Sequence, residues 1–340
     1  MIVSTTLAGP GAERSIEGAL RSVVHQVDRC LVALSGCDEE ATRAGVEAVV
    51  PGDKLITRAL PWPGRYDFAR QEVLDWAGSI GAEWAVTVDC DERVTLPADY
   101  RDILAAHPGA HVWNLRGCDH GPCDNQSPGH GYCKERILRA NVGLRWHGRV
   151  CENVLSNRQG VIAGHFWENE KTPAEERRRY ERGVTETERM IAEGDDRFKW
   201  HRHMGSCHAG LGRMGKALEC YEEALKRPHG EEDEARCVYL ICEQLVIAGR
   251  LDEAHDRAAL GLARHAGFIP EFGSILAWAQ MERGDLENAS RWAQLVQLCP
   301  PDRKRVGHRG KECHGRARAV LQRIEEHNEA ALARADERAA

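Results

Sequence analysis

The stretch EWAVTVDCDE at residues 83–92 decides the fold of the N-terminal half of this sequence. A short apolar run follows Gly81 and ends in three carboxylates, Asp89, Asp91 and Glu92, which predicts a buried strand with acid at its C-terminal end. In open α/β sheets, ligands bind at that edge. Carboxylates this close together repel one another, and hard divalent cations prefer such oxygen ligands. The stretch therefore predicts a metal–diphosphate site, and the alternative is an acidic, solvated loop after a strand.

Strands and helices alternate in the sequence before this stretch. Apolar runs predict three further strands, and helical spacing of apolar residues predicts three helices. In chain order these six segments are residues 2–7, 16–27, 31–34, 41–49, 55–57 and 67–76. With the acidic strand they give a βαβαβαβ order, which predicts a mostly parallel sheet with helices on both faces.

Length, charge and cysteine content limit the classes of protein to which the sequence can belong. A chain of 340 residues is long enough for about two domains. Its net charge of -7 gives no positive field to gather nucleic acid or anionic lipid. The sequence has no run of 18 apolar residues and no signal-peptide pattern at its N-terminus, so we expect a cytoplasmic protein without a membrane span. Thirteen scattered cysteines, an odd number, predict reduced thiols rather than a disulfide framework.

Three further segments accompany the acidic strand end in a fixed order. They are DFAR at 67–70, RILR at 136–139 and WHGRVCE at 146–152. With the acidic motif at 89–92, they resemble the DFA-x-x-RN, D-x-D-E, RLFR-like and W-x-G-x-V-H-E segments of family 2 glycosyltransferases with the GT-A fold. In that family a nucleoside-diphosphate sugar lies across the strand ends, and a divalent cation bridges its diphosphate to the acidic motif. The resemblance implies a nucleotide-sugar donor, with a UDP-sugar as first choice, and a Mn²⁺ or Mg²⁺ ion.

The same resemblance implies roles for individual residues. Asp91 is the expected direct metal ligand, and Asp89 is expected nearer the ribose as well as the metal. Arg70 and Asp38 are expected to contact the donor. His165 resembles a late family histidine that completes the metal shell, and a structural histidine is the alternative.

Three positions depart from the family pattern. Leu34 stands where the family has an aspartate that contacts the nucleobase, with Asp38 a few residues further on. Glu72 is the nearest counterpart of the asparagine of the RN pair, and Cys151 replaces the histidine of the H-E pair. The first departure leaves the base open, the third removes that histidine's role, and neither affects the metal motif.

The reaction also needs a group that accepts a proton. Glycosyl transfer builds negative charge on the departing diphosphate, which a nearby cation stabilises most in the transition state. An inverting transfer requires a carboxylate or imidazole to take the acceptor's proton on the opposite face. We expect Glu152 to be this base and His147 to be the second choice. The alternative for Glu152 is a surface ion pair with Arg149 or Arg145.

A cysteine-rich segment has no counterpart in the family pattern. Cys118, Cys123 and Cys133 lie with His120 and His130 within sixteen residues. Zinc prefers such ligands, but the spacing matches no standard zinc knuckle. We therefore favour an acceptor-facing loop with free thiols over a structural zinc site.

The sequence from residue 172 onward is rich in helix formers. A charged helix over 171–196 is expected to link two domains. A G-x-[L/M]-x-x-A frame then recurs at Gly212, Gly249 and Gly284, with spacings of 37 and 35 residues. This period resembles that of tetratricopeptide repeats. We expect all-α repeats over 197–302, followed by a basic connector and a capping helix over 303–340.

The sequence thus predicts an α/β glycosyltransferase domain at 1–170 followed by an all-α, tetratricopeptide-like domain. The expected acceptor is a peptide, a protein or a glycan. Because helical repeats present extended surfaces, they are expected either to hold the acceptor or to pair two subunits as a homodimer. The alternative is a non-catalytic adaptor in which a decayed transferase domain supports the repeats.

Overall fold

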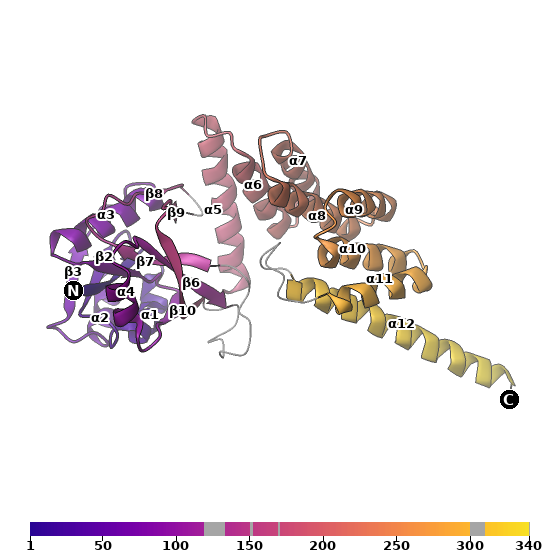
Figure 1. The fold of residues 1–340 in the computed structure, drawn as a ribbon, viewed down its shortest axis with the longest axis horizontal. Coiled ribbons are helices and arrows are strands. Elements are labelled where there is room, and N and C mark those ends of the chain that lie inside the picture. Colours follow the sequence, from indigo (N-terminus) through magenta and orange to yellow (C-terminus); the bar gives the residue numbers. More distant parts are fainter. Residues whose placement is uncertain (119–132, 150–151, 169–170, 300–309, 340) are drawn as a thin grey trace. The chain divides into compact units, whose positions relative to one another are not determined.

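The computed structural model describes residues 1–118, 133–149, 152–168, 171–299 and 310–339. The chain forms two compact units, Met1–Lys171 and Thr172–Ala340, and each is described by itself (Figure 1). The first unit is α/β and the second is built of helices, so the predicted fold class is confirmed.

The described part of the first unit contains one sheet of eight strands and one of two. The large sheet has the order β3-β2-β1-β4-β7-β6-β10-β5, and β8 pairs with β9. The strands are β1 (Ile2–Ala8), β2 (Arg29–Leu34), β3 (Leu55–Ala59), β4 (Trp84–Thr87), β5 (Glu92–Thr95), β6 (Val112–Cys118), β7 (Cys133–Arg139), β8 (Trp146–His147), β9 (Asn153–Val154) and β10 (Gln159–Glu168).

The first four strands of the large sheet are parallel, as their order in the sequence predicts. Strand β1 pairs with β2 and β4, and β2 pairs with β3, all in the parallel sense. The carboxyl ends of these strands therefore lie at one edge. The other half is mixed: β7 runs antiparallel to both β4 and β6, β10 runs parallel to β6, and β5 runs antiparallel to β10.

Helices cover both faces of the sheet. Strand side chains project alternately to the two faces, so each face has residues against which a helix can pack. The helices of this unit are α1 (Ile16–Val23), α2 (Glu39–Glu47), α3 (Tyr66–Ser79) and α4 (Tyr100–Ala106), with a short 3-10 helix at Ala12–Arg14. Helix α1 packs in one core cluster with Ile2 and Val32, whereas α3 packs in another with their neighbours Val3 and Leu31.

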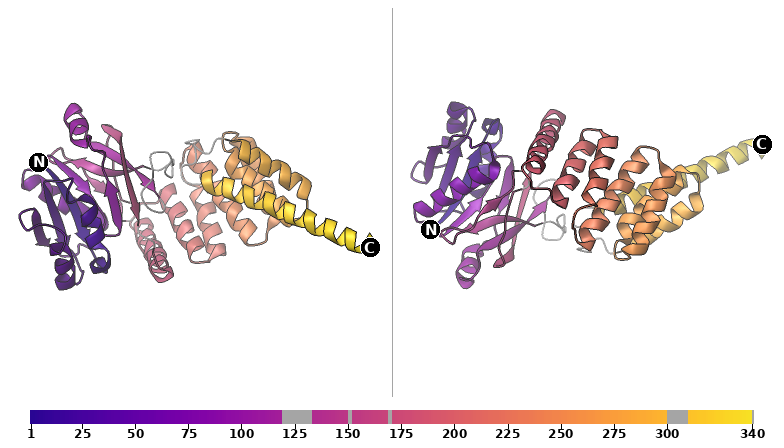
Figure 2. Two further views of the ribbon diagram at one scale, coloured as in Figure 1. Left: turned by 90° about the horizontal axis from the view of Figure 1, so that it is seen from below. Right: turned by 90° about the horizontal axis from the view of Figure 1, so that it is seen from above.

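The second unit consists of successive helices, most of them paired (Figure 2). They are α5 (Pro173–Ala192), α6 (Phe198–Gly210), α7 (Met214–Ala224), α8 (Glu231–Ile247), α9 (Leu251–Arg264), α10 (Ile269–Glu282), α11 (Leu286–Leu298) and α12 (Gly310–Ala339). Gly212, Gly249 and Gly284 follow the first helix of each pair with φ of 70°, 72° and 82°. Glycine is the usual residue for this left-handed helix ending, so the repeated frame marks the turns between paired helices.

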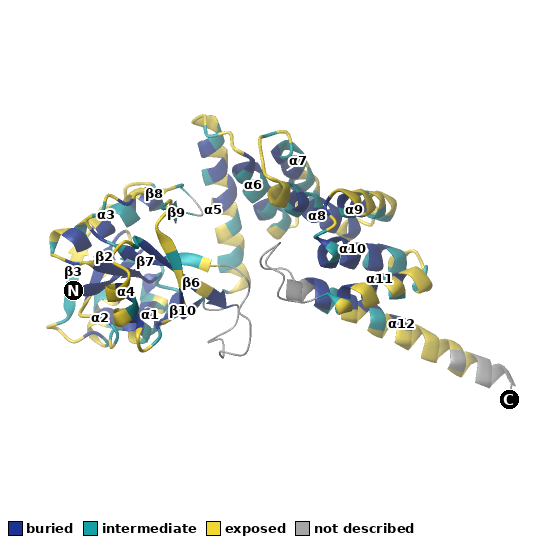
Figure 3. Ribbon diagram, viewed as in Figure 1, coloured by how far each residue is buried: buried dark blue, intermediate teal, exposed yellow. Residues whose placement is uncertain are grey.

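Small residues let neighbouring helices of this unit approach closely. A Cβ added at Gly205 would lie 2.5 Å from the Tyr221 ring, and one at Gly261 would lie 2.5 Å from the Phe272 ring. Helix α5 packs on α6 in the same way, with Gly183 against Cys207. Figure 3 shows the resulting buried faces, and in α12 residues 325–331 are exposed.

A membrane-spanning helix must be both long and apolar. Among the described residues, no helix combines the length and the apolar composition that crossing a bilayer requires.

Cys118 is disulfide-bonded, whereas ten other described cysteines are free thiols. The prediction of reduced thiols throughout is therefore wrong at Cys118, because sequence spacing does not show which loop cysteines the fold brings together.

Candidate functional site

The acidic motif forms a tight turn between β4 and β5 at the carboxyl edge of the parallel strands. The amide of Glu92 donates to the carbonyl of Asp89 at 2.9 Å, and the amide of Asp89 donates to the Glu92 carboxylate at 3.3 Å. The Cys90 thiol donates to the carbonyl of Leu7, near the end of β1, at 3.3 Å. These contacts fix the motif across the end of the sheet, where the sequence predicts a ligand site.

Two arginines bind the first and last carboxylates of the motif. Arg70 Nη2 of α3 lies 2.7 Å from Asp89 Oδ1, and Arg136 Nη2 of β7 lies 3.5 Å from Asp89 Oδ2. Arg136 also forms an ion pair with Glu92, and both residues are 1% exposed. Lys134 Nζ lies 3.8 Å from the same Glu92 carboxylate. Buried charges need such pairing, because desolvation alone would be costly.

The two bound carboxylates respond differently to their surroundings. Burial opposes ionisation of Asp89, but Arg70 and Arg136 outweigh it and hold the pKa of Asp89 well below its usual range. Burial raises the pKa of Glu92, and the opposite effect of Arg136 does not fully compensate. Asp89 is therefore a firmly ionised acceptor, and Glu92 depends on Arg136 for its charge.

Helix α3 brings the segment that contains Glu152 to this motif. Asp67 accepts from the amide of Gly148 at 3.0 Å, and Gln71 accepts from the amide of Trp146 at 3.0 Å. Residues spaced by three or four share one face of a helix, so Arg70 points in the same direction. Its Nε lies 3.8 Å from Glu152 Oε2, and its guanidinium lies 5.2 Å from the Trp146 ring centroid.

All four sequence segments that resemble the glycosyltransferase family thus meet at one place. Each contributes a charged residue to the cluster: Arg70 from DFAR, Asp89 from the acidic motif, Arg136 from RILR and Glu152 from WHGRVCE. The Glu152 side chain is 14% exposed. Burial raises the pKa of Glu152, and Arg70 partly offsets that effect. Arg145, one of the alternative partners, instead pairs with Asp75 at 3.5 Å.

Among the described residues, no hydrogen bond or ion pair joins three other predicted site residues to this cluster. His147 lies exposed on β8, opposite Asn153. His165 lies in β10 opposite Thr95, and burial together with Arg116 lowers the pKa of His165. Asp38 caps α2 by accepting from the amide of Ala41 at 3.1 Å.

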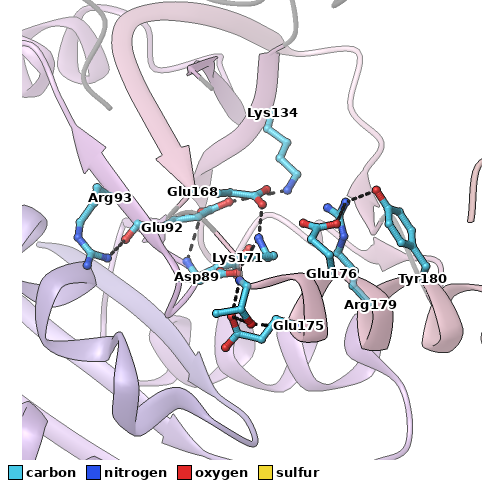
Figure 4. A network of polar contacts seen from close by, with 12 residues as sticks. Asp89, Glu92, Arg93, Lys134, Glu168, Lys171, Glu175, Glu176, Arg179 and Tyr180 are labelled. Carbon is cyan, nitrogen blue, oxygen red and sulfur yellow. Dashed lines mark hydrogen bonds and ion pairs between the residues drawn. The ribbon is translucent and has the colours of Figure 1, made fainter. Parts of the chain in front are cut away.

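Asp91, the middle carboxylate, binds a lysine that sequence reasoning missed. Lys171 Nζ lies 3.1 Å from Asp91 Oδ2. It also lies 2.5 Å from Glu168 Oε2 (Figure 4). Burial disfavours the charged lysine, but the two carboxylates outweigh it and raise the pKa of Lys171. Glu168 reaches the site because β10 pairs with β5 so that Glu168 stands opposite Glu92. No local sequence pattern signals that pairing.

Asp91 is the member of the motif that best fits a divalent cation. Among the described residues, no group of three His, Cys, Asp or Glu side chains is arranged to hold a metal. Asp89 and Glu92 pair with arginines and Asp91 pairs with Lys171, but the Asp91 side chain is 43% exposed and so can also be reached from solvent. A Mg²⁺-type ion commonly takes one or two carboxylates together with substrate phosphates and water. These residues are compatible with an ion of that kind, for which Asp91 would be the protein ligand.

The zinc hypothesis falls largely on residues that the structure leaves undescribed. Cys123, His120 and His130 lie outside the described residues, as does Cys151. Cys118 ends β6 in a disulfide, and Cys133 begins β7 as an exposed free thiol. A disulfide sulfur cannot bind zinc as a thiolate, so Cys118 is excluded as a zinc ligand and is not one of the expected free thiols. A role in zinc binding for the other residues stays a prediction.

Comparison with known proteins gives similarities in structure alone. No protein-family model and no curated protein matches the sequence. S. aureus TarS 1-349 has a TM-score of 0.36 and 14% identity over 96% of this chain and 92% of its own. The same TarS fragment in complex with UDP-GlcNAc gives a TM-score of 0.36 and 13% identity over the same shares. MamA has a TM-score of 0.33 and 12% identity, covering 48% of this chain and 98% of its own. Similarities at this level do not assign an activity.

Proposed function

We propose that this chain is an inverting glycosyltransferase that moves a sugar from a nucleoside-diphosphate sugar to an acceptor. One observation carries the proposal: Arg70 joins Asp89 at 2.7 Å to Glu152 at 3.8 Å, at the carboxyl edge of the parallel strands. In open α/β sheets this edge is where ligands bind. Asp89, which is firmly ionised, and Glu152, whose pKa is raised, both contact Arg70 there. Two carboxylates with different pKa values can take different roles in one reaction.

The donor side of the site is assigned to the acidic motif. Asp91 would hold a Mn²⁺ or Mg²⁺ ion, which supplies neutralisation of the charge that develops on the diphosphate. Asp89, kept ionised by Arg70 and Arg136, would accept a hydrogen bond from the ribose hydroxyls. Asp38, near the end of β2, would lie toward the nucleobase, with UDP as the nucleotide. Arg70 positions Asp89 and Glu152 relative to each other.

The acceptor side is assigned to Glu152 as the general base. A base works best when its pKa lies near the operating pH, and burial moves the pKa of Glu152 in that direction. Arg70 keeps the ionised form available. His147 is exposed and makes no described contact with the cluster, so it is the second choice.

We assign binding of the acceptor to the helical unit. The acceptor is a peptide, a protein or a glycan. The paired helices of this unit make the extended surface that helical repeats use for elongated partners. The same surface would serve a homodimer, and sedimentation of the full chain distinguishes the two uses.

A non-catalytic adaptor is the second candidate, and one observation favours it. Asp89 and Glu92 are both held in ion pairs with arginines, which is also how a structural charge cluster would be built. The two candidates differ in turnover. We expect the wild-type chain with Mn²⁺ to hydrolyse a UDP-sugar slowly, and Asp91→Asn to abolish this while Asp53→Asn, at an exposed turn, retains it. No hydrolysis by the wild type would contradict the transferase, and equal rates in the two variants would contradict the role of Asp91.

A further inference from the structure

Lys171 occupies the side of Asp91 that a cation would use. The lysine is 17% exposed, and its Nζ bridges Asp91 Oδ2 at 3.1 Å and Glu168 Oε2 at 2.5 Å. The three residues come from separate places in the sequence: the turn after β4, the end of β10 and the segment after it. Figure 4 shows Lys171 next to Glu168.

The other basic residues of the site are engaged elsewhere. Arg70 binds Asp89, Arg136 binds Glu92 and Asp89, and Lys134 faces Glu92. Of these basic residues, Lys171 is the one whose ammonium group contacts the Asp91 carboxylate. Asp91 is also the carboxylate that fits the metal, so the ammonium group and a divalent cation would meet at the same side chain.

A divalent cation and an ammonium group bound to one carboxylate would repel each other strongly, since they carry three positive charges within a few ångströms. Lysine has a flexible four-carbon stem and can move, whereas the backbone of the Asp91 turn is fixed by the Asp89 and Glu92 hydrogen bonds. Glu168 offers Lys171 a second carboxylate after Asp91 is taken.

We infer that Lys171 is a built-in cation that holds Asp91 when no metal is bound, and that a divalent cation displaces it from Asp91 onto Glu168. This rests on the proposed function for the role of Asp91. Lys171 then weakens the binding of free metal and keeps the exposed carboxylate neutralised until a metal arrives. Because the residue competes with the ion, removing its charge should tighten metal binding, although the site loses a native contact.

The test is a titration of the full-length chain with Mn²⁺ alone, with free Mn²⁺ followed by electron paramagnetic resonance. We expect Lys171→Met to bind Mn²⁺ roughly two- to tenfold more tightly than wild type, since a partly exposed lysine–carboxylate pair is a modest competitor. Lys171→Arg keeps the competing charge and should stay within about twofold of wild type. Lys171→Gln is a second neutral variant in case the methionine variant does not fold.

Arg93→Met is the matched control. Arg93 lies near Asp91 and senses its charge, but its guanidinium donates to the carbonyl of Glu92 at 2.8 Å rather than to the Asp91 carboxylate. The inference expects a smaller effect in Arg93→Met than in Lys171→Met. Equal gains in the two variants would show a general charge effect and overturn it, as would unchanged affinity in both neutral Lys171 variants.

Failure of this inference can be told from failure of the proposed function. Each variant is also tested for stabilisation by UDP in a thermal-shift assay with Mn²⁺. If UDP stabilises the wild type but neutral Lys171 variants gain no metal affinity, the displacement model alone is wrong. If neither Mn²⁺ nor UDP binds any variant, the donor site and the inference are both wrong.

Discussion

Arg70 Nη2 lies 2.7 Å from Asp89 Oδ1, and Arg70 Nε lies 3.8 Å from Glu152 Oε2, so one side chain joins the two carboxylates assigned to donor and acceptor. Its guanidinium also lies against the Trp146 ring. Arg70 is 12% exposed, and removing it would leave two carboxylates without their shared partner in a poorly solvated place.

Arg70→Met should therefore destabilise the first unit. We expect a loss of about 3 kcal/mol in the free energy of unfolding, since breaking a buried ion pair leaves uncompensated charge. Urea denaturation measures this. Arg145→Met, which removes an exposed partner of Asp75, serves as the control and should change stability by about 0.5 kcal/mol or less. Equal losses in the two variants would contradict a special role for Arg70.

Glu152 should give the protein a specific pH dependence. Burial raises the pKa of Glu152 above its ordinary value of 4.5. A carboxyl group of this kind favours folding through its protonated form, so its contribution is fully present below about pH 4.5 and is lost as pH rises through the raised pKa. Glu152→Gln does not titrate, so its stability relative to wild type should increase from pH 4 to pH 7. Chemical denaturation at both pH values measures the difference, and a constant difference would contradict the raised pKa.

The same residue should control turnover. If Glu152 accepts the acceptor's proton, Glu152→Gln should lower the transfer rate by roughly two decades with little change in donor binding. His147→Gln, which changes an exposed ring on β8, should have little effect. Transfer kinetics with saturating donor would decide, and the reverse order of effects would assign the base to His147.

The paired helices should be sensitive to one added methyl group at selected glycines. Gly261→Ala would place a Cβ 2.5 Å from the Phe272 ring and should destabilise the second unit by about 1–3 kcal/mol through overpacking. Gly215→Ala, near the start of α7, has no heavy atom within 4 Å of the added Cβ and should stabilise by up to about 1 kcal/mol. Thermal unfolding of both variants checks the sign of each effect, and equal shifts would contradict the close packing.

The acceptor role of the helices should appear in a truncated chain. A fragment of residues 1–171 keeps the described core clusters of the first unit, together with Lys171. We expect it to hydrolyse the nucleotide-sugar slowly and to lose transfer to the acceptor. Full transfer by the folded fragment would contradict an acceptor role, and an insoluble fragment would favour a purely structural role for the helices.

Local patterns in the sequence predicted much of the fold and part of the site. The periodicity of β1 to β4 and of α1 to α3 predicted the parallel half of the sheet, and the repeated glycine frame predicted the helix turns. The fold features depend on residues close in sequence or on the parallel topology that those residues imply. The resemblance of four short segments to the glycosyltransferase family, rather than any local pattern, implied that Arg70, Asp89 and Glu152 belong together.

The rest depends on pairing between distant segments. Strand β5 has only four residues, and its antiparallel register with β10 places Glu168 opposite Glu92. That register also places His165 opposite Thr95. His165 comes three residues before Glu168 in β10, so the two side chains lie on opposite faces of the sheet. Neither the position of Lys171 nor the separation of His165 from the cluster could be read from the sequence, because no local periodicity encodes this register.

Calorimetric binding of UDP to the full-length chain tests the central claim most directly, with and without Mn²⁺ and in wild type and Asp91→Asn. We expect UDP to bind the wild type in the presence of Mn²⁺ and at least about tenfold more weakly without it, and we expect Asp91→Asn to lose this metal dependence while remaining folded. UDP binding that is unaffected by both Mn²⁺ and the Asp91 substitution would contradict a metal–diphosphate site at the acidic strand end.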